Sequence, residues 1–127
     1  MGSFAFGTRG HYSDGESVPT LVHGEHSIAI GSACAVGTST ENETSNYSGA
    51  FGFYNIVKPG ADYSYLLGSS NWTNKKYTYM LGHGLRNDDG SEDIVVLGKY
   101  NTKPADDDLL VVGNGTSESD RKNAFKI

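Results

Sequence analysis

The chain has 127 residues, a length typical of one domain, and a formal net charge of −5 at pH 7. This charge disfavours a nucleic-acid partner, because proteins that bind phosphates need a clustered basic surface. Membrane insertion is not expected either, since no apolar stretch approaches the roughly 20 residues that a spanning helix needs. Glycine occurs 17 times and proline only three times, which favours tight turns between short strands over a collagen-like repeat.

Seven short apolar runs in the chain each end on a glycine. Their closing glycines are separated by 24, 21, 16, 14, 16 and 15 residues. Runs of aliphatic, aromatic or β-branched residues that stop at glycine predict strands that enter a turn. Because no helical periodicity accompanies them, we expect a single all-β domain over residues 1–127, built from short repeats. The runs span residues 3–7, 27–31, 48–52, 64–68, 78–82, 94–98 and 109–113.

A second, weaker strand is predicted between successive runs. Residues 33–36, 55–57 and 99–102 mix polar and apolar side chains, as expected of an outer strand that faces solvent. Two short strands and two turns fit into 14 to 16 residues, which corresponds to one flattened coil of a β-solenoid. Such a coil encloses a thin core, so we expect stacking of coils and oligomerisation to supply the missing burial.

Both faces of the predicted strands are apolar. Side chains alternate between the two faces of a strand, and a monomeric two-sided sheet should carry polar residues on its outer face. We therefore expect the second and fourth residues of each run, such as Tyr65 and Leu67, to face the chain's own core. The third residues should face a sister chain, in a symmetric homo-oligomer, or belong to the core. These third residues are Ala5, Ala29, Ala50, Leu66, Met80, Val96 and Val111.

No metal or cofactor is expected from the polar residues. His23 and His26 are three residues apart, which suits two ligands only on a helix or special loop, and no third ligand lies nearby in sequence. The acidic groups at 88–89 and 106–108 lack the glycine-aspartate repeat of calcium-binding rolls and are predicted to form turns. Cys34 lies among small apolar residues and is predicted to be buried.

Two polar insertions lengthen the first two intervals, at residues 8–26 and 38–47. They are either loops that project from the shaft and touch a receptor, or surface insertions that are tolerated because longer loops cost little.

A carbohydrate contact is the second candidate site. The only tryptophan lies in a polar turn, and aromatic rings flanked by asparagine and threonine suit the apolar faces and hydroxyls of sugars. The alternative is that these rings shield the core or a chain interface. The predicted ligand contacts are Trp72, Asn71, Tyr47 and Tyr54.

Catalysis is not expected. The chain has no Gly-x-Ser-x-Gly elbow, no His-Glu-x-x-His sequence and no phosphate-binding loop, and nothing marks a pair of carboxylates for glycoside cleavage.

Residues 27–37 read Ser-x-Ala-Ile-Gly followed by Ala-x-Ala-x-Gly. This repeat resembles the head repeat of YadA-type trimeric autotransporter adhesins. The resemblance is full for this repeat and partial for the first and third, and from Ser64 onward only the strand-plus-glycine skeleton is retained. It implies a left-handed parallel β-roll (β-solenoid) of short repeats, assembled as an intertwined or side-by-side homotrimer, with the third-position residues in the trimer interface or core.

The C-terminal residues 109–117 and 121–127 resemble a segment common in bacteriophage tail fibres and tailspikes. There it closes a β-roll and leads into a trimerisation or chaperone module. Together the resemblances imply the structural and receptor-binding segment of a phage tail fibre or tailspike, a fragment of a longer protein that attaches the virion tail to a host-surface glycan. Two alternatives stay open: the head of a bacterial trimeric surface adhesin, and a polysaccharide-degrading spike enzyme.

Overall fold

The computed structural model describes residues 2–11, 17–40 and 42–127, which form strands and turns. Within these ranges there is no helix, and hence none that could cross a membrane. The strands are β1 (Phe4–Thr8), β2 (Gly10–His11), β3 (Ser17–Val18), β4 (Leu21–Val22), β5 (Ile28–Ser32), β6 (Ala35–Val36), β7 (Gly49–Phe53), β8 (Ile56–Val57), β9 (Tyr65–Ser69), β10 (Trp72–Thr73), β11 (Thr78–His83), β12 (Arg86–Asn87), β13 (Ile94–Lys99), β14 (Leu110–Asn114) and β15 (Asn123–Lys126).

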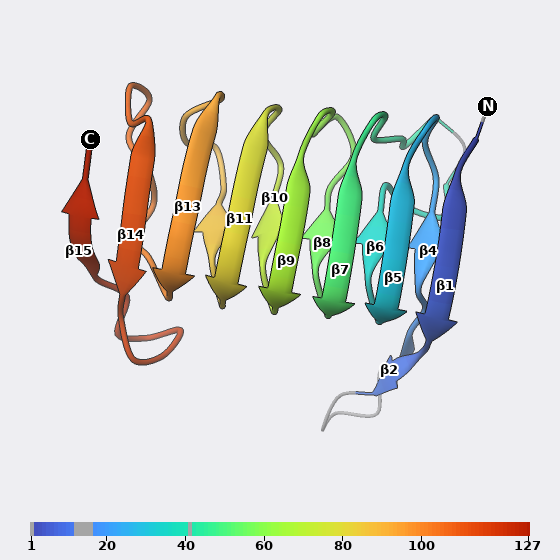
Figure 1. Ribbon diagram of the computed structural model, residues 1–127, viewed down its shortest axis with the longest axis horizontal. Coiled ribbons are helices and arrows are strands. Elements are labelled where there is room, and N and C mark those ends of the chain that lie inside the picture. The colour runs from blue at the N-terminus through green and yellow to red at the C-terminus, as the bar shows by residue number, and fades with distance from the viewer. Residues whose placement is uncertain (1, 12–16, 41) are drawn as a thin grey trace.

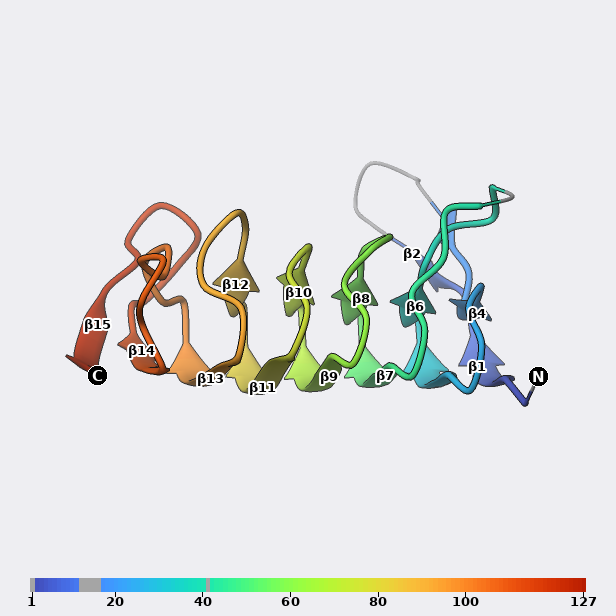
Figure 2. The same cartoon turned by 90° about the horizontal axis from the view of Figure 1, so that it is seen from above.

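Two stacked sheets make up the body of the molecule. The larger sheet has eight strands in the order β1-β5-β7-β9-β11-β13-β14-β15, all parallel except for the antiparallel pair β14–β15 (Figure 1). The smaller sheet, β4-β6-β8-β10-β12, is parallel throughout and forms a second layer (Figure 2). From β4 to β13 the chain alternates between the two sheets and contributes one strand to each sheet in every coil, as a parallel β-solenoid does. The expectation of an all-β, repeat-built solenoid is thus confirmed at this level.

The closing glycines form one row across the larger sheet. Gly52, Gly68 and Gly82 occupy equivalent positions in neighbouring strands, and the same register continues to both ends of the parallel part. The row is crowded: a Cβ atom on Gly68 would lie 1.9 Å from the carbonyl oxygen of Gly82. Gly68 also has a φ of +120°, which side chains rarely tolerate. Close stacking therefore explains why each run ends on glycine.

Two corners connect the sheets in each coil, and both use residues with positive φ. Tyr47, Tyr63 and Tyr77 hold φ values of 52–59° at the corner before the long strand. Their rings stack with centroids 5.1 and 5.0 Å apart, outside the coil. A serine follows two of them, and the Oγ of Ser48 accepts the backbone N–H of Ser64 in the next coil at 3.2 Å. The stacked rings and buried hydroxyls hold this corner in an otherwise unfavourable conformation.

Asparagines line the other corner inside the coil. Asn71 is fully buried, and its backbone N–H donates to the Oδ1 of Asn55 at 3.2 Å. Its own Oδ1 accepts the N–H of Leu85 at 2.9 Å, while its Nδ2 donates to the carbonyl of Gly82 at 2.9 Å. Each buried amide therefore links successive coils, and satisfied polar ladders of this kind fix the register.

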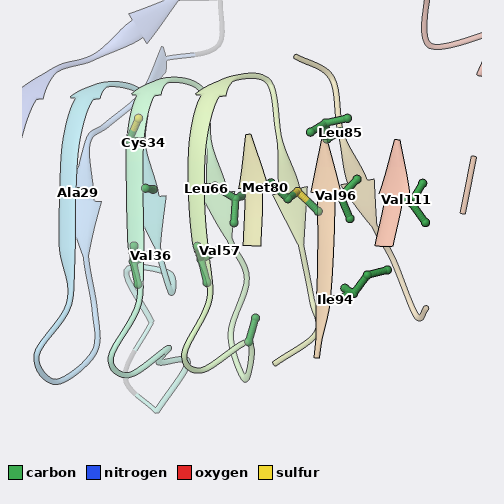
Figure 3. Packing of buried hydrophobic residues seen from close by; sticks show 12 residues of the cluster. Ala29, Cys34, Val36, Val57, Leu66, Met80, Leu85, Ile94, Val96 and Val111 are labelled. Atoms are coloured by element: carbon green, nitrogen blue, oxygen red, sulfur yellow. The ribbon is translucent and has the colours of Figure 1, made fainter. Parts of the chain in front are cut away.

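The hydrophobic core lies between the two sheets and continues from coil to coil along the solenoid (Figure 3). On the larger sheet it consists of Ile94 and of the third residues of every run but the first, each no more than 2% exposed. The expected orientation of the faces is therefore wrong: these residues point inward, and the second and fourth residues point outward. Because the coil is thin, the space between the sheets takes aliphatic side chains and methionine from the larger sheet. The inward third residues are Ala29, Ala50, Leu66, Met80, Val96 and Val111.

The first coil departs from this pattern, because Ala5 in the edge strand β1 is exposed. The weaker strands were predicted in part. Residues 33–36 and 55–57 contain β6 and β8, but 99–102 hold no strand beyond the end of β13 at Lys99. There the side chain of Asn101 caps the corner by donating to the carbonyls of Arg86 and Thr102, at 2.9 and 2.8 Å, so the chain turns away.

The first insertion, residues 8–26, contains the antiparallel hairpin β2–β3 and the strand β4. Figure 1 shows β2 beyond the ends of the long strands, at the N-terminal end of the solenoid. Residues 12–16 of this insertion and Glu41 of the second insertion, 38–47, lie outside the described residues. Part of the hypothesis that these loops bind a receptor therefore concerns residues outside the described ranges.

Candidate functional site

An apolar surface covers the outer face of the larger sheet; we call it the sheet face. It is formed by the second and fourth residues of the runs, and none of these residues is charged. Phe6 and Leu81 are 68% and 58% exposed, although their side chains would contribute about 1.5–3 kcal/mol each if fully buried. Contiguous apolar patches of this kind are uncommon on monomers and mark contact surfaces. Its most exposed members are Phe4, Phe6, Tyr65, Leu67, Tyr79, Leu81 and Val95.

The middle of the sheet face is hollowed. A shallow apolar depression of about 180 Å³ lies over β9, β11 and β13. The rings of Tyr65 and Tyr79 stack across adjacent strands there, with centroids 6.2 Å apart. A partner would therefore meet a contoured surface of aromatic and aliphatic side chains, as in interfaces with good shape complementarity.

A polar pocket lies on the opposite side of the molecule, on the outer face of the smaller sheet. Its centre is Trp72 of β10, which pairs in register with Ile56 of β8 and Arg86 of β12. Successive residues of a strand point to opposite faces, so these three side chains point outward while their successors are buried. The pocket has a volume of about 340 Å³ and is lined by Tyr54, Ile56, Lys58, Ser70, Trp72, Arg86 and Glu118.

Two cations lie against the indole ring of Trp72. The Nζ of Lys58 is 4.2 Å from the ring centre, and the guanidinium carbon of Arg86 is 5.0 Å from it. Such cation–π contacts contribute about 0.5–1 kcal/mol at exposed sites and more when they are desolvated. Arg86 also forms an ion pair with Glu118, with an Nη2–Oε2 distance of 3.2 Å. The ring is therefore not a bare platform, because cations cover part of it.

The pocket keeps unused hydrogen-bonding capacity. The Nε of Arg86 is buried, yet it has no hydrogen-bond partner among the described residues. Lys58 forms no ion pair with the part of the chain that the structure describes. Glu118, by contrast, is neutralised twice, since its Oε2 also accepts a hydrogen bond from the Nη2 of Arg121 at 2.7 Å. Positive charge thus outweighs negative charge along the pocket wall.

Asp88 lies next to this wall, two residues after Arg86. Its Oδ1 is buried and has no partner among the described residues. Burial raises the pKa of Asp88 above its ordinary value, against the opposing effect of Arg86 and Lys58. Asp88 is therefore a second acidic group, besides Glu118, that interacts with the cations of the pocket.

Two of the four predicted ligand residues, Trp72 and Tyr54, lie together in this pocket. The expectation is wrong for Asn71, which is fully buried and uses its amide atoms within the corner ladder. Tyr47 lies at the other corner of the coil, stacked between His26 at 5.2 Å and Tyr63 at 5.1 Å. Its ring is 40% exposed, but both ring faces are occupied by these neighbours.

Lys58, Arg86 and Glu118 were not anticipated. A signal for Arg86 is present in the sequence, because it follows Trp72 by 14 residues, the same interval that separates Gly68 from Gly82. Residues one coil apart stack, so Arg86 had to lie beside Trp72. Glu118 reaches the pocket from the C-terminal loop, and no interval reveals such a contact.

The remaining polar candidates have structural roles. The Nδ1 of His23 lies 2.7 Å from the carbonyl oxygen of Thr38, and His26 stacks on Tyr47. The Oδ2 of Asp108 accepts the N–H of Ala105 at 2.8 Å, which confirms its predicted place in a turn. In the described ranges, no group of three or more histidine, cysteine or acidic residues is arranged to hold a metal ion.

Cys34 is fully buried, as predicted. Its Sγ donates to the carbonyl of Gly52 at 3.3 Å, and burial raises the pKa of the thiol.

The chain matches no protein-family model, no curated protein and no solved structure. The resemblances of residues 27–37 and of the C-terminal segment therefore rest on those residues alone. The sheet face and the Trp72 pocket are therefore the surfaces that support a function for this chain.

Proposed function

We propose that this chain is a structural and receptor-binding segment of a phage tail fibre or tailspike, a left-handed β-roll that assembles as a homotrimer. The observation that carries this proposal is the sheet face. Seven large apolar side chains on the outer face of one sheet are 37–68% exposed in the single chain. Every copy of the chain presents the same surface, so a closed, symmetric assembly buries it without leaving a free apolar edge.

The proposed interface differs from the one expected from the sequence. The third residues, such as Leu66 and Val96, are buried within one chain and are not available to a partner. The second and fourth residues take their place. Side chains such as Tyr79 and Leu81, about half exposed, would each gain roughly 1 kcal/mol on burial between chains.

The receptor-binding part of the proposal rests on the position of the Trp72 pocket. The pocket and the sheet face lie on opposite sides of the solenoid, because they belong to the outer faces of the two sheets (Figure 2). Assembly through the sheet face therefore leaves three identical pockets open. Weak contacts at three linked pockets add through effective concentration, which suits attachment to a repetitive cell-surface polymer.

The assembly is tested by placing a charge on the sheet face. Leu81→Asp buries an unpaired carboxylate in the proposed interface and should shift the chain from trimer to monomer. Ser39→Asp is the matched control, since it adds the same charge at an exposed loop position and should leave the trimer intact. Sedimentation velocity measures both variants, and circular dichroism checks their fold. The proposal is wrong if Leu81→Asp sediments as the unmodified chain does.

A further inference from the structure

We propose that the Trp72 pocket binds a saccharide that carries a carboxylate, such as a uronic or sialic acid unit of a polysaccharide. The inference rests on the proposed attachment function for the source of this saccharide. Its chemical class follows from the pocket itself. An aromatic ring, two cations and a hydroxyl converge in a volume of about 340 Å³, which is within the range of small-molecule sites.

Lys58 favours an anionic ligand over a neutral one. Its ammonium group rests 4.2 Å from the centre of the Trp72 ring, where a stacked sugar would have to lie. A neutral sugar has to displace this cation from the ring and carries no charge that could replace the lost cation–π contact. A carboxylate instead draws the exposed ammonium into an ion pair, and the same movement uncovers the ring for the apolar face of the sugar. The pocket therefore discriminates in favour of anionic sugars.

Arg86 offers a second positive charge beside the ring. Its Nη2 is held by Glu118 at 3.2 Å, and Glu118 is held in turn by Arg121 at 2.7 Å. The guanidinium is thus oriented by its ion pair before any ligand arrives, which lowers the ordering cost of binding. Its Nε remains buried without a partner in the described residues, and a buried N–H without an acceptor costs about 1–3 kcal/mol. A ligand oxygen that reaches this N–H would satisfy it.

The balance of charge and polarity around the pocket also favours an acidic sugar. Lys58, Arg86 and Arg121 carry three positive charges around the site, against the carboxyl groups of Glu118 and Asp88. Glu118 is already shared by two guanidinium groups, so Lys58 is the cation that a ligand can recruit. The hydroxyl of Ser70, which lines the same pocket, can both donate to and accept from sugar hydroxyls.

Trp72 is the only tryptophan in the chain, so its fluorescence reports on this pocket alone. The probes are oligosaccharides that contain glucuronic, galacturonic or sialic acid, each compared with the same oligosaccharide after reduction of its carboxyl groups to alcohols. We expect a saturable change in fluorescence with at least one acidic probe and none with its reduced form. Lys58→Gln should weaken the binding about tenfold or more, because a charge-assisted contact is lost.

Lys103→Gln is the matched control, because it removes the same charge from an exposed position outside the pocket. It should leave the affinity unchanged. The inference is overturned if no acidic probe gives a saturable change, if the reduced probes bind equally well, or if both lysine variants weaken binding to the same extent. Circular dichroism confirms that each variant is folded. The mass of the same samples tests the assembly separately, so failure of either proposal can be recognised on its own.

Discussion

The row of closing glycines makes a specific prediction about stability. Gly68→Ala places a methyl group 1.9 Å from the carbonyl oxygen of Gly82, a backbone atom that cannot move aside by rotation. Gly60→Ala provides a matched comparison, because Gly60 also has a positive φ, +84°, but no atom lies within 4 Å of its missing Cβ. Both substitutions strain the backbone, whereas only Gly68→Ala also creates a clash.

The expected magnitudes differ accordingly. The strain of a positive φ costs about 1–2 kcal/mol at Gly60, and at least as much at Gly68, whose φ of +120° lies farther from the left-handed helical region. At Gly68 the contact must also lengthen from 1.9 Å to about 3.0 Å, which forces β9 and β11 apart. Each buried backbone group that loses its partner adds about 1–3 kcal/mol. We therefore expect Gly68→Ala to cost at least about 2 kcal/mol more than Gly60→Ala.

Urea unfolding followed by circular dichroism measures both variants, at one fixed protein concentration because assembly contributes to stability. The two free energies of unfolding are compared with that of the unmodified chain. If Gly68→Ala and Gly60→Ala fall within about 0.5 kcal/mol of each other, close stacking is not the reason for glycine at these positions, and the argument is refuted.

Three further predictions follow from the core and the buried titratable groups. Cys34 should not react with a thiol reagent at pH 8 in the native protein, and a thiol count after unfolding in urea should then give one per chain. Asp88→Asn should raise Tm at pH 7, because the raised pKa of Asp88 means that its ionised carboxylate opposes folding. Below pH 3 the carboxyl group is neutral in the folded and unfolded states, so the substitution should leave Tm unchanged. Equal changes in Tm at both pH values would contradict this. Leu66→Ala should lower the free energy of unfolding in urea by about 2–5 kcal/mol. A decrease below about 1 kcal/mol would mean that the hydrophobic core is not tightly packed around Leu66.

The parallel register could be read from the sequence because glycine has a physical reason to recur. Only a residue without Cβ fits where backbones of neighbouring coils approach each other, so intervals between closing glycines measure the coil length. The same reasoning could have been extended to side chains. Asn55, Asn71 and Asn101 each follow a closing glycine by three residues, and this position is the inner corner of the coil.

The orientation of the strands could not be read in the same way. A period of two shows that side chains alternate but does not show which set faces inward when both sets are apolar. Side-chain size carries the missing information only in part of the chain. Ala50 fits between the closely spaced sheets whereas Phe51 at the alternate position lies outside, but buried Leu66 and outward Leu67 are of the same size.

The candidate pocket was found only in part for a related reason. Trp72 and Tyr54 stand out by residue type, but Asn71 in the same polar turn looked equally exposed and is in fact buried. Exposure at a solenoid corner depends on which side of the backbone a residue faces, and composition does not show this. Glu118 joins the pocket through a loop that folds back across the sheet, a contact with no local sequence signal.

The most direct test of the account is the solution mass of the unmodified chain, measured by light scattering coupled to size exclusion over a range of concentrations. If the sheet face is the interface of the proposed homotrimer, the mass is three times the 13.6 kDa of one chain. A mass of 13.6 kDa at every concentration would mean that the apolar face stays exposed to water, and the proposed trimeric fibre segment would be contradicted.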